Sequence, residues 1–348
     1  MLVLQPHNRQ KDHCMPVPFR IRRFAPTAAD YAAISVIGAS TPPEYALDYE
    51  FRTADGWRAL DDSFAQAGQP IVRYIATADG SAVAYAYSFE IAWAPPAGRY
   101  WCVIRVLPEY GRRGIGAHLY AQLLADLQTC GASAMLLELD DTLAELRPAL
   151  ERRGFQALLQ SWFFTLDPRT CDLAAFAAPD QRLRGLHFTT LADELAQGAD
   201  WLLPLHQLYA AVAGDVPIPG HPHAAPPPEW LAQQARGLPI SLPDAFFIVR
   251  DGPRYVGMSY LHRDVEASDQ LLQRITAIHA DYRGRGIALA LKLKTIEYAQ
   301  QHGFHAIHTA VESNNPSMLA INAKLGFVQG PGLILLEKTL TVAEFKVP

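Results

Sequence analysis

Hydrophobic residues occur with two alternating periods along this chain. Apolar residues fill short runs at 72–76 and 82–87, which is typical of strands, and Asp79-Gly80 between them predicts a hairpin turn. A further strand is predicted over residues 101–107. The stretch after it carries one leucine per helical turn, at Leu119, Leu123 and Leu127. This succession of strands and helices predicts an α/β (α+β) chain.

The N-terminal part of the chain has a weaker pattern. Residues 1–17 are predicted to form a polar tail, and residues 19–24 alternate as a half-buried strand does. Thr27 is placed to cap the helix that is predicted to follow. Residues 40–69 are interpreted as a loop-rich region.

The same order of elements occurs again in the second half. Gly114 and Gly286 each open a predicted helix, and Gly154 and Gly326 each precede a phenylalanine near the end of a half. The differences 286 − 114 and 326 − 154 give the same offset, 172 residues. Two landmarks with one offset predict duplication of a whole domain.

We therefore expect two tandem domains. The first covers residues 18–167, the second covers residues 186–348, and a linker rich in Ala, Pro and charge joins them at 168–185. The length of 348 residues exceeds one typical domain, and half of the residues are hydrophobic, enough for a core in each.

Composition excludes several classes of function. A net charge of −5 gives no electrostatic support for nucleic-acid binding. Four cysteines are scattered without metal-type spacing, which indicates reduced thiols, no metal site and a cytoplasmic protein. No long uncharged run is present, so neither a signal peptide nor a membrane span is expected.

The basic turn at 283–288, Arg-Gly-Arg-Gly-Ile-Ala, carries the most chemical information. It lies between a strand that ends near Ile278 and a helix that runs to about Gln301. Such a turn leaves several backbone N–H groups unpaired at the helix start, all pointing one way, and its glycines let an anion approach closely. Arg283 and Arg285 add positive charge. The turn is therefore predicted to hold a phosphate.

Three further motifs follow the turn in order: a predicted strand at 306–311, Asn-Asn-Pro-Ser-Met at 314–318, and Leu-Gly-Phe at 325–327. This ordered set resembles the GNAT N-acetyltransferase superfamily, whose turn has the form Arg/Gln-x-x-Gly-x-Gly/Ala. The matching positions are Arg283, Gly286 and Ala288. A tandem pair with the more complete motif in the second half is similar to the mycothiol synthase group of that superfamily.

The resemblance implies a fold and a co-substrate. Each half would contain a mixed, mostly antiparallel sheet flanked by helices, with fourth and fifth strands that splay apart to form a cleft. Acetyl-CoA would bind there, its pyrophosphate on the turn and its pantetheine arm along the open edge of the fourth strand. The residues implied to bind it in the second half are Ile278, Arg283, Gly284, Arg285, Gly286, Ile287, Ala288 and Asn315.

The first half departs from this pattern. Its corresponding residues are Arg112, Arg113, Gly114, Ile115 and Gly116. Gly111 takes the Arg/Gln position, and Asp140-Asp141-Thr142 replaces the Asn-bearing segment. The second half is therefore the better candidate for catalysis, and whether the first half binds acetyl-CoA stays open.

The catalytic groups are less clear than the turn. Many members of the family have a Glu eleven residues before the turn's Arg/Gln and a Tyr four residues before the Gly of Leu-Gly-Phe, positions held here by Leu272 and Asn322. We expect direct attack of the amine on the thioester, polarised by a backbone N–H near Ile278. The proton would leave through water to Glu312, His279 or a pocket carboxylate such as Glu266.

Each catalytic candidate also has a structural interpretation. Glu312 fits a solvated loop carboxylate, and His279 fits a polar residue at a strand end. Asn322 can donate a hydrogen bond at the site, or it can bond to backbone as a buried helix residue. His221 and His223 lie in a Pro-rich loop without further ligands at metal spacing.

The sequence as a whole predicts an acetyl-CoA-dependent N-acetyltransferase that acts on a primary amine of a small molecule. The Pro-rich loop at 216–228 and the interface between the halves would shelter the acceptor. A non-catalytic CoA-binding or sensing module and a protein N-acetyltransferase are the alternatives. We expect a monomer or homodimer without nucleic-acid or membrane partners.

Overall fold

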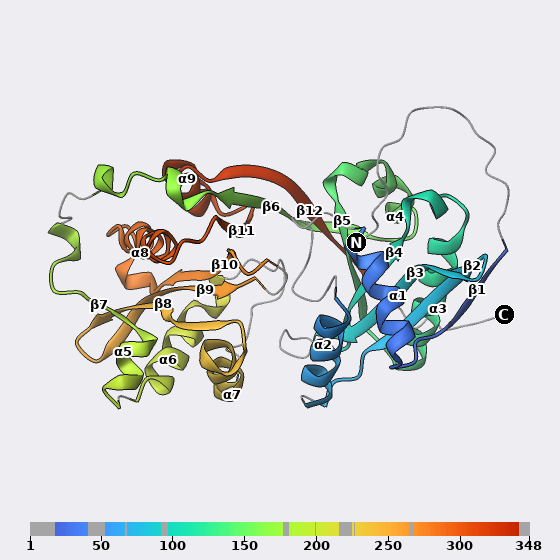
Figure 1. Ribbon diagram of the computed structural model, residues 1–348, viewed down its shortest axis with the longest axis horizontal. Coiled ribbons are helices and arrows are strands. Elements are labelled where there is room, and N and C mark those ends of the chain that lie inside the picture. The colour runs from blue at the N-terminus through green and yellow to red at the C-terminus, as the bar shows by residue number, and fades with distance from the viewer. Residues whose placement is uncertain are drawn as a thin grey trace. The chain divides into compact units, whose positions relative to one another are not determined.

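The computed structural model describes residues 18–340 except 41–52, 67, 92–96, 177–180, 199, 216–224, 226 and 265–266. Contacts divide the chain into two compact units, shown in Figure 1. Unit 1 is drawn from the residues up to Ser161 and from Pro331 onward, and unit 2 consists of Trp162–Gly330. No helix of the described residues is long and apolar enough to cross a membrane.

Unit 1 is a mixed sheet with helices packed on it. Its helices are α1 (Ala28–Ala39), α2 (Ala54–Gln66), α3 (Ile115–Thr129) and α4 (Arg147–Glu151). Its strands, in spatial order, are β1 (Phe19–Arg23), β2 (Val72–Ala78), β3 (Ser81–Glu90), β4 (Arg99–Val106), β5 (Ala134–Asp140) and the greater part of β12 (Val328–Thr339). Neighbours are antiparallel except β4 and β5.

The helix α2 corrects one expectation. Residues 40–69 were interpreted as loop-rich, but residues 54–66 form a helix. Trp57, Leu60 and Phe64 are buried at helical spacing. They pack with α1 against one face of the sheet, where Tyr85 and Tyr87 of β3 lie. Burial of these three side chains against the apolar face of the sheet stabilises the helix. The sequence interpretation missed their helical spacing.

Unit 2 has the same plan. Its helices are α5 (Leu191–Ala196), α6 (Leu202–Val212), α7 (Pro228–Ala232), α8 (Ile287–Gln301) and α9 (Pro316–Leu325). Its strands, in spatial order, are the end of β6 (Gln156–Leu166), β11 (Ala306–Glu312), β10 (Gln270–Ile278), β9 (Arg254–Arg263), β8 (Ser241–Asp251) and β7 (His187–Thr190). From β7 to β10 neighbours are antiparallel, whereas β10 and β11 are parallel.

Helices cover both faces of the unit 2 sheet (Figure 1). The helix α8 lies on β8, β9 and β10, where Leu291 packs with Val249 and Val256. The helices α5, α6 and α7 pack on the opposite face, where Leu205 and Leu208 contact the apolar side chains of β8 and β9. The predicted α/β (α+β) class, with mixed and mostly antiparallel sheets, is confirmed.

The repeat appears directly in the elements. The helices α3 and α8 begin at residues 115 and 287 and end at 129 and 301, so both ends keep the offset of 172. The strands β5 and β11 begin at 134 and 306 with the same offset. The tandem organisation predicted from the glycines is therefore confirmed.

Unit 1 takes a strand from the far end of the chain, and unit 2 takes one from the end of the first repeat. The end of β6, which follows α4 in sequence, is the neighbour of β11 in unit 2. Residues Leu333–Thr339 of β12 pair antiparallel with Ala134–Asp140 of β5 in unit 1. The domain boundaries predicted from the sequence are different. They place the greater part of β12 in the second domain, 186–348, rather than with residues 18–167.

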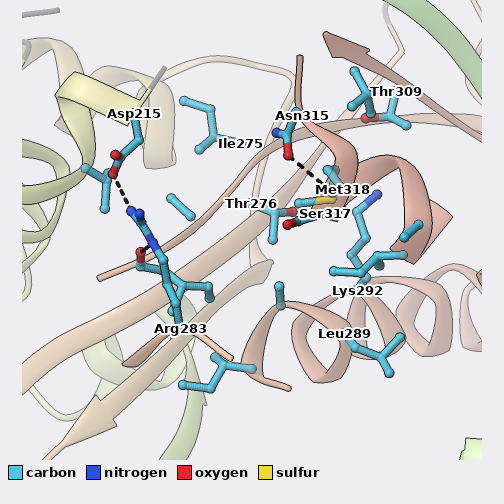
Figure 2. Close-up of a pocket in the computed structure, with 18 of the residues that line it drawn as sticks. Asp215, Ile275, Thr276, Arg283, Leu289, Lys292, Thr309, Asn315, Ser317 and Met318 are labelled. Atoms are coloured by element: carbon cyan, nitrogen blue, oxygen red, sulfur yellow. Dashed lines mark hydrogen bonds and ion pairs between the residues drawn. The ribbon is translucent and has the colours of Figure 1, made fainter. Parts of the chain in front are cut away.

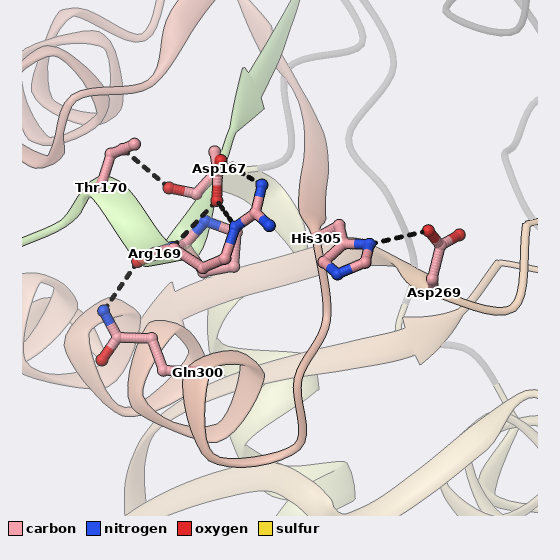
Figure 3. A network of polar contacts seen from close by, with 7 residues as sticks. Asp167, Arg169, Thr170, Asp269, Gln300 and His305 are labelled. Carbon is pink, nitrogen blue, oxygen red and sulfur yellow. Dashed lines mark hydrogen bonds and ion pairs between the residues drawn. The ribbon is translucent and has the colours of Figure 1, made fainter.

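The segment after β6 packs against α8 within unit 2. Gln300 of α8, labelled in Figure 3, donates from Nε2 to the carbonyl oxygens of Pro168 (2.7 Å) and Cys171 (2.9 Å). Asp167 stabilises the short turn that follows, because its carboxylate accepts from the backbone N–H and the guanidinium of Arg169. The first part of the predicted linker 168–185 is thus an ordered part of unit 2.

Candidate functional site

A cleft opens in unit 2 where two parallel strands part. The strands β10 and β11 pair only from Gln270 to Leu272 and from Ala306 to His308. Beyond these residues the described chain shows no pairing between them, and a cleft of about 1120 Å³ lies there. The predicted splay of the fourth and fifth strands is confirmed in this unit. One backbone edge of β10 therefore faces the cleft rather than a strand.

A bulge shapes β10 at the inner end of the cleft. Between Gln273 and Thr276 the register against β9 shifts, so that β10 carries one extra residue. A buried polar network holds it. Gln273 Nε2 donates to Ser259 Oγ and to the carbonyl of Tyr260 (both 3.0 Å), and Thr295 of α8 donates to Gln273 Oε1 (2.8 Å). These side chains bond to each other, so they position the strand.

The start of α8 supplies an anion site at the outer end of the cleft. Gly286 is the N-cap with φ 84°, and no side chain caps the helix within the described chain. A positive φ is readily adopted only by glycine, and the uncapped first turn leaves N–H groups of Ile287 and Ala288 directed at the cleft that both residues line. Gly284 has φ 74° and also lines the cleft. The turn at 283–288 that is predicted to bind phosphate, the anion seat, therefore has the required backbone conformation.

The two arginines of the turn have different surroundings. Arg283 lines the cleft, donates from Nε to the carbonyl of Ile278 (3.1 Å) and forms an ion pair with Asp215 (Figure 2). Arg285 is directed away, with its guanidinium over the ring of Tyr282 and its Nε donating to the carbonyl of Arg182 (3.0 Å). Arg285 is not among the cleft-lining residues.

Two cleft residues near the turn were not found from the sequence. Arg182 lines the cleft and reaches it from the segment that was interpreted as a linker. Asp215 ends the 3₁₀ turn that follows α6, and it supplies the carboxylate that pairs with Arg283. Both lie far from the motif in sequence, and no spacing rule connects them to it.

Asn315 stands on the other wall of the cleft. Its Oδ1 accepts from the backbone N–H of Met318 (3.2 Å) and so caps α9, with Pro316 at the first helical position (Figure 2). Asn315, Ser317 and Met318 all line the cleft. Ile278 lines it from β10, as the resemblance implied.

The three catalytic candidates occupy different environments. Glu312 lies half-buried at the end of β11 and lines the cleft, and burial raises the pKa of its carboxyl. His279 is not a cleft-lining residue, and its Nε2 accepts from Arg254 (2.6 Å). Asn322 is fully buried and is also not a lining residue. Only Glu312 of the three faces the cleft directly. Glu266, His221 and His223 lie outside the described residues.

Lys292 is the cleft residue of most interest that sequence reasoning missed. It is 2% exposed, lines the cleft and donates from Nζ to Asn322 Oδ1 (2.6 Å). Its ammonium also lies 4.6 Å from the ring centre of Phe327. Burial lowers the pKa of Lys292 to about 7. Helical spacing was the available signal, because position 292 shares a face with Ala288 and Thr295.

The corresponding turn in unit 1 keeps part of this geometry. Gly114 caps α3 with φ 84°, as Gly286 caps α8. Arg112, at the position of Gly284, adopts φ 59°, which costs free energy for a side-chain-bearing residue. The cleft there measures about 320 Å³, and Leu146 and Leu150 are among the residues that line it.

The residues implied to bind acetyl-CoA in unit 1 are also only partly together. Arg112, Gly114, Ile115 and Gly116 line the smaller cleft. Arg113 is not among the lining residues, and its guanidinium lies over the ring of Tyr110. Within the described ranges of the whole chain, no cluster of three or more His, Cys, Asp or Glu side chains is placed to hold a metal ion.

Comparison with known proteins identifies relatives of both halves. The model of the acetyltransferase (GNAT) family matches residues 38–155 and residues 213–327. A search of curated protein sequences finds no match.

Solved structures share the whole tandem fold. A GCN5-related N-acetyltransferase from Sphaerobacter thermophilus is 17% identical, with a TM-score of 0.65 over 93% of this chain and 96% of its own. A tandem GNAT protein from the clavulanic acid biosynthesis pathway is 18% identical, with a TM-score of 0.66 over 92% and 98%. A glucosamine N-acetyltransferase region of a fungal multi-domain β-N-acetylglucosaminidase is 14% identical, with a TM-score of 0.65 over 94% of this chain and 39% of its own. At these identities the likeness is one of fold.

Proposed function

Because this chain belongs to the acetyltransferase (GNAT) family, we propose that unit 2 transfers an acetyl group from acetyl-CoA to a primary amine of a small molecule. The observation that carries this proposal is the cleft of unit 2, where the uncapped N-terminus of α8 meets the open edge of β10. The first feature suits a pyrophosphate, and the second suits the amide-bearing pantetheine arm, which can pair with a strand edge. Among the similar structures, one is named for glucosamine, a small amine.

The anion seat combines backbone and side-chain donors. The N–H groups of Ile287 and Ala288 would bind phosphate oxygens, and Arg182 and Arg283 stand at the same end of the cleft. Arg283 is paired with Asp215, so a bound diphosphate would compete with this carboxylate for the guanidinium. Binding is therefore expected to release Asp215 toward the acceptor side, where Tyr209 and Val212 of α6 also line the cleft.

Glu312 is the base that we assign to the amine. Deprotonating an amine with a pKa of about 10.4 at neutral pH costs roughly 4–5 kcal/mol, so the site must help. The Glu312 carboxylate lines the cleft in a half-buried position, and burial raises its pKa, which makes it a stronger base. It would take the proton through water. The bulged, open edge of β10 supplies backbone N–H groups for the thioester carbonyl.

The first experiment measures co-substrate binding by calorimetry on the full chain. We expect one CoA site per chain, because the cleft of unit 1 is about 320 Å³ against about 1120 Å³ in unit 2. Gly286→Glu should weaken binding by at least about 100-fold, since it strains the turn and places a carboxylate at the anion seat.

Gly303→Glu is the matched control. Gly303 follows the other end of α8, also has a positive φ of 73° and has no atom within 4 Å of an added Cβ. This variant should bind CoA as the unsubstituted chain does. Unchanged affinity in Gly286→Glu would overturn the assignment of the site. Thiol release from acetyl-CoA with a panel of amines then separates an enzyme from a CoA-binding module, which would bind without releasing thiol.

A further inference from the structure

A buried cation in the cleft has no role in the mechanism above. Lys292 donates to Asn322 Oδ1 (2.6 Å), and no carboxylate of the described chain lies within ion-pairing distance of its Nζ. The Nδ2 of Asn322 is itself buried without a hydrogen-bond partner among these residues. The Asn322 amide thus directs its oxygen at the Lys292 ammonium, although its NH₂ group has no hydrogen-bond partner among the described residues in this orientation. This orientation fixes the ammonium at the cleft wall.

Lys292 is placed at the inner end of the cleft. Thr295 Oγ1 lies 2.8 Å from the carbonyl oxygen of Lys292 and 2.8 Å from Oε1 of Gln273, so these two acceptors share its one hydroxyl hydrogen, and Gln273 lies at the bulge of β10. The anion seat at Gly286 lies at the other end of β10 and its turn. Figure 2 shows the Lys292 side chain rising from α8 toward Ser317 and Met318 of α9. A ligand bound at the seat and extended along β10 toward the bulge would therefore approach this lysine.

The proposed reaction needs an acid at that end. When the tetrahedral adduct collapses, the carbon–sulfur bond breaks and its electron pair remains on sulfur as a thiolate. A thiol of this kind has a pKa of about 8.5, so protonation of the thiolate assists its departure. A donor with a pKa near 7 is partly protonated at neutral pH and gives its proton to such a thiolate favourably, which fits the value of about 7 for Lys292.

The other ionisable groups of the cleft are less suited to this role. They are Arg182, Tyr209, Asp215, Arg274, Tyr282, Arg283, Glu312 and Lys324. Arginine does not deprotonate in proteins, and Asp215 is paired with Arg283. Burial raises the pKa of Tyr209 well above its ordinary value, while Tyr282 donates its O–H to Asp251 (2.6 Å). Lys324 places its ammonium over the ring of Phe176.

We propose that Lys292, held by Asn322, is the general acid that protonates the CoA sulfur as it leaves the acetyl group. This inference rests on the proposed function. The Lys292 ammonium gives one proton to the thiolate and becomes a neutral amine. The acceptor amine, on forming its bond to the acetyl carbon, gives one proton to water or Glu312. Lys292 then takes a proton back from solvent, so the overall reaction is acetyl-CoA plus amine giving amide plus CoA thiol.

The first test needs no acceptor. The ultraviolet absorbance of the thiolate is followed as bound CoA is titrated with base in the full chain. If the Lys292 ammonium faces the sulfur, it stabilises the thiolate and lowers the pKa of the bound thiol below that of free CoA. In Lys292→Met we expect this lowering to be lost. Lys294→Met, an exposed position two residues along α8 whose lysine pairs with Glu297, should keep it.

The second test is kinetic. Lys292→Met should reduce kcat about 10²–10³-fold while the Kd for CoA changes less than about 3-fold. Lys292→Arg keeps a charge but cannot donate a proton, and it should not rescue kcat. In the unsubstituted chain kcat should fall as pH rises through the pKa of Lys292, and this descending limb should be absent from Lys292→Met.

The outcomes distinguish the two proposals. If CoA does not bind the unsubstituted chain, the proposed function fails and this inference fails with it. If CoA binds and Lys292→Met keeps the thiol pKa of the unsubstituted chain, only the role of Lys292 is overturned. Full rescue of kcat by Lys292→Arg would likewise reduce Lys292 to an electrostatic positioning residue. Loss of CoA binding in Lys292→Met would indicate a structural role instead.

Discussion

At the scale of single residues, burial decides what the polar side chains of the cleft can do. Glu312 and Lys292 both line it, and burial shifts their pKa values in opposite directions, up for the carboxyl and down for the ammonium. Both shifts bring the groups closer to neutral pH, where acid–base exchange is effective. His279 is instead hydrogen-bonded to Arg254 and is not among the residues that line the cleft.

The buried lysine predicts a pH-dependent stability. The pKa of Lys292 is about 7 in the folded chain and about 10.4 in the unfolded chain, which corresponds to a free-energy cost on the order of 5 kcal/mol for burying the ammonium. Below pH 7 Lys292 is protonated in both the folded and the unfolded chain, so the folded chain bears the full free-energy cost of burying the ammonium. Between pH 7 and 10 the unfolded state binds more protons, so this cost declines as pH rises. Lys292→Met should therefore stabilise the chain most at pH 6.

Thermal unfolding of Lys292→Met at a series of pH values checks this. Its advantage in Tm over the unsubstituted chain should be several degrees at pH 6 and should shrink toward pH 9. Lys294→Met removes an exposed lysine from the same helix and should change Tm little at any pH. An advantage of Lys292→Met that stays constant with pH would show that the folded and unfolded pKa values do not differ.

At the scale of elements, β12 completes the sheet of unit 1 although it is the last strand of the chain. Its Leu335 and Leu336 are buried where β12 pairs with β5. Glu337 accepts from Nε of Arg99 on β4 (3.0 Å), and the Arg99 side chain is 1% exposed. The strand thus brings both apolar surface and the partner of a buried cation.

Glu337→Ala should destabilise unit 1 by about 3–5 kcal/mol, because it leaves the Arg99 guanidinium buried without its carboxylate. Urea unfolding monitored by circular dichroism measures the change. Glu151→Ala breaks an exposed pair with Arg147 on α4 and should cost at most about 0.5 kcal/mol. Equal effects of the two substitutions would mean that Arg99 finds another partner once Glu337 is gone.

At the scale of the whole molecule, the units do not coincide with the two sequence repeats. Unit 2 is the continuous segment 162–330, whereas unit 1 needs residues from both sides of it. The fragment 162–330 should therefore unfold cooperatively by itself. The fragment 186–348 lacks the β6 strand and keeps β12 without β5, so it should show no cooperative transition.

Calorimetric unfolding of the two fragments at equal concentration compares them directly. A length-matched fragment that starts at residue 162 and ends at residue 324 is the control for truncation, since it keeps the end of β6 but stops before Leu325 and Phe327, which belong to the core. It should be less stable than 162–330. A cooperative transition in 186–348 would show that the terminal strands contribute little to either unit.

Local sequence determined the repeat, the phosphate turn and the helices next to it. Gly286 and Gly114 need no distant contact to adopt a positive φ and open a helix, because the absence of a Cβ permits it. Thr27 caps α1 as predicted, since a cap bonds within one turn, to the N–H of Asp30. The splayed strands followed only from resemblance to a family, because spacing alone does not separate paired strands from parted ones.

Tertiary structure decided everything that depends on residues far apart in the chain. Asp215 meets Arg283, Lys292 meets Asn322, and β12 meets β5, each across a separation that no local pattern encodes. The acidity of Lys292 is a property of its surroundings, since the same residue type at 294 lies exposed beside Glu297. Sequence fixes which side chains are present, and packing fixes which of them lose water and so change their chemistry.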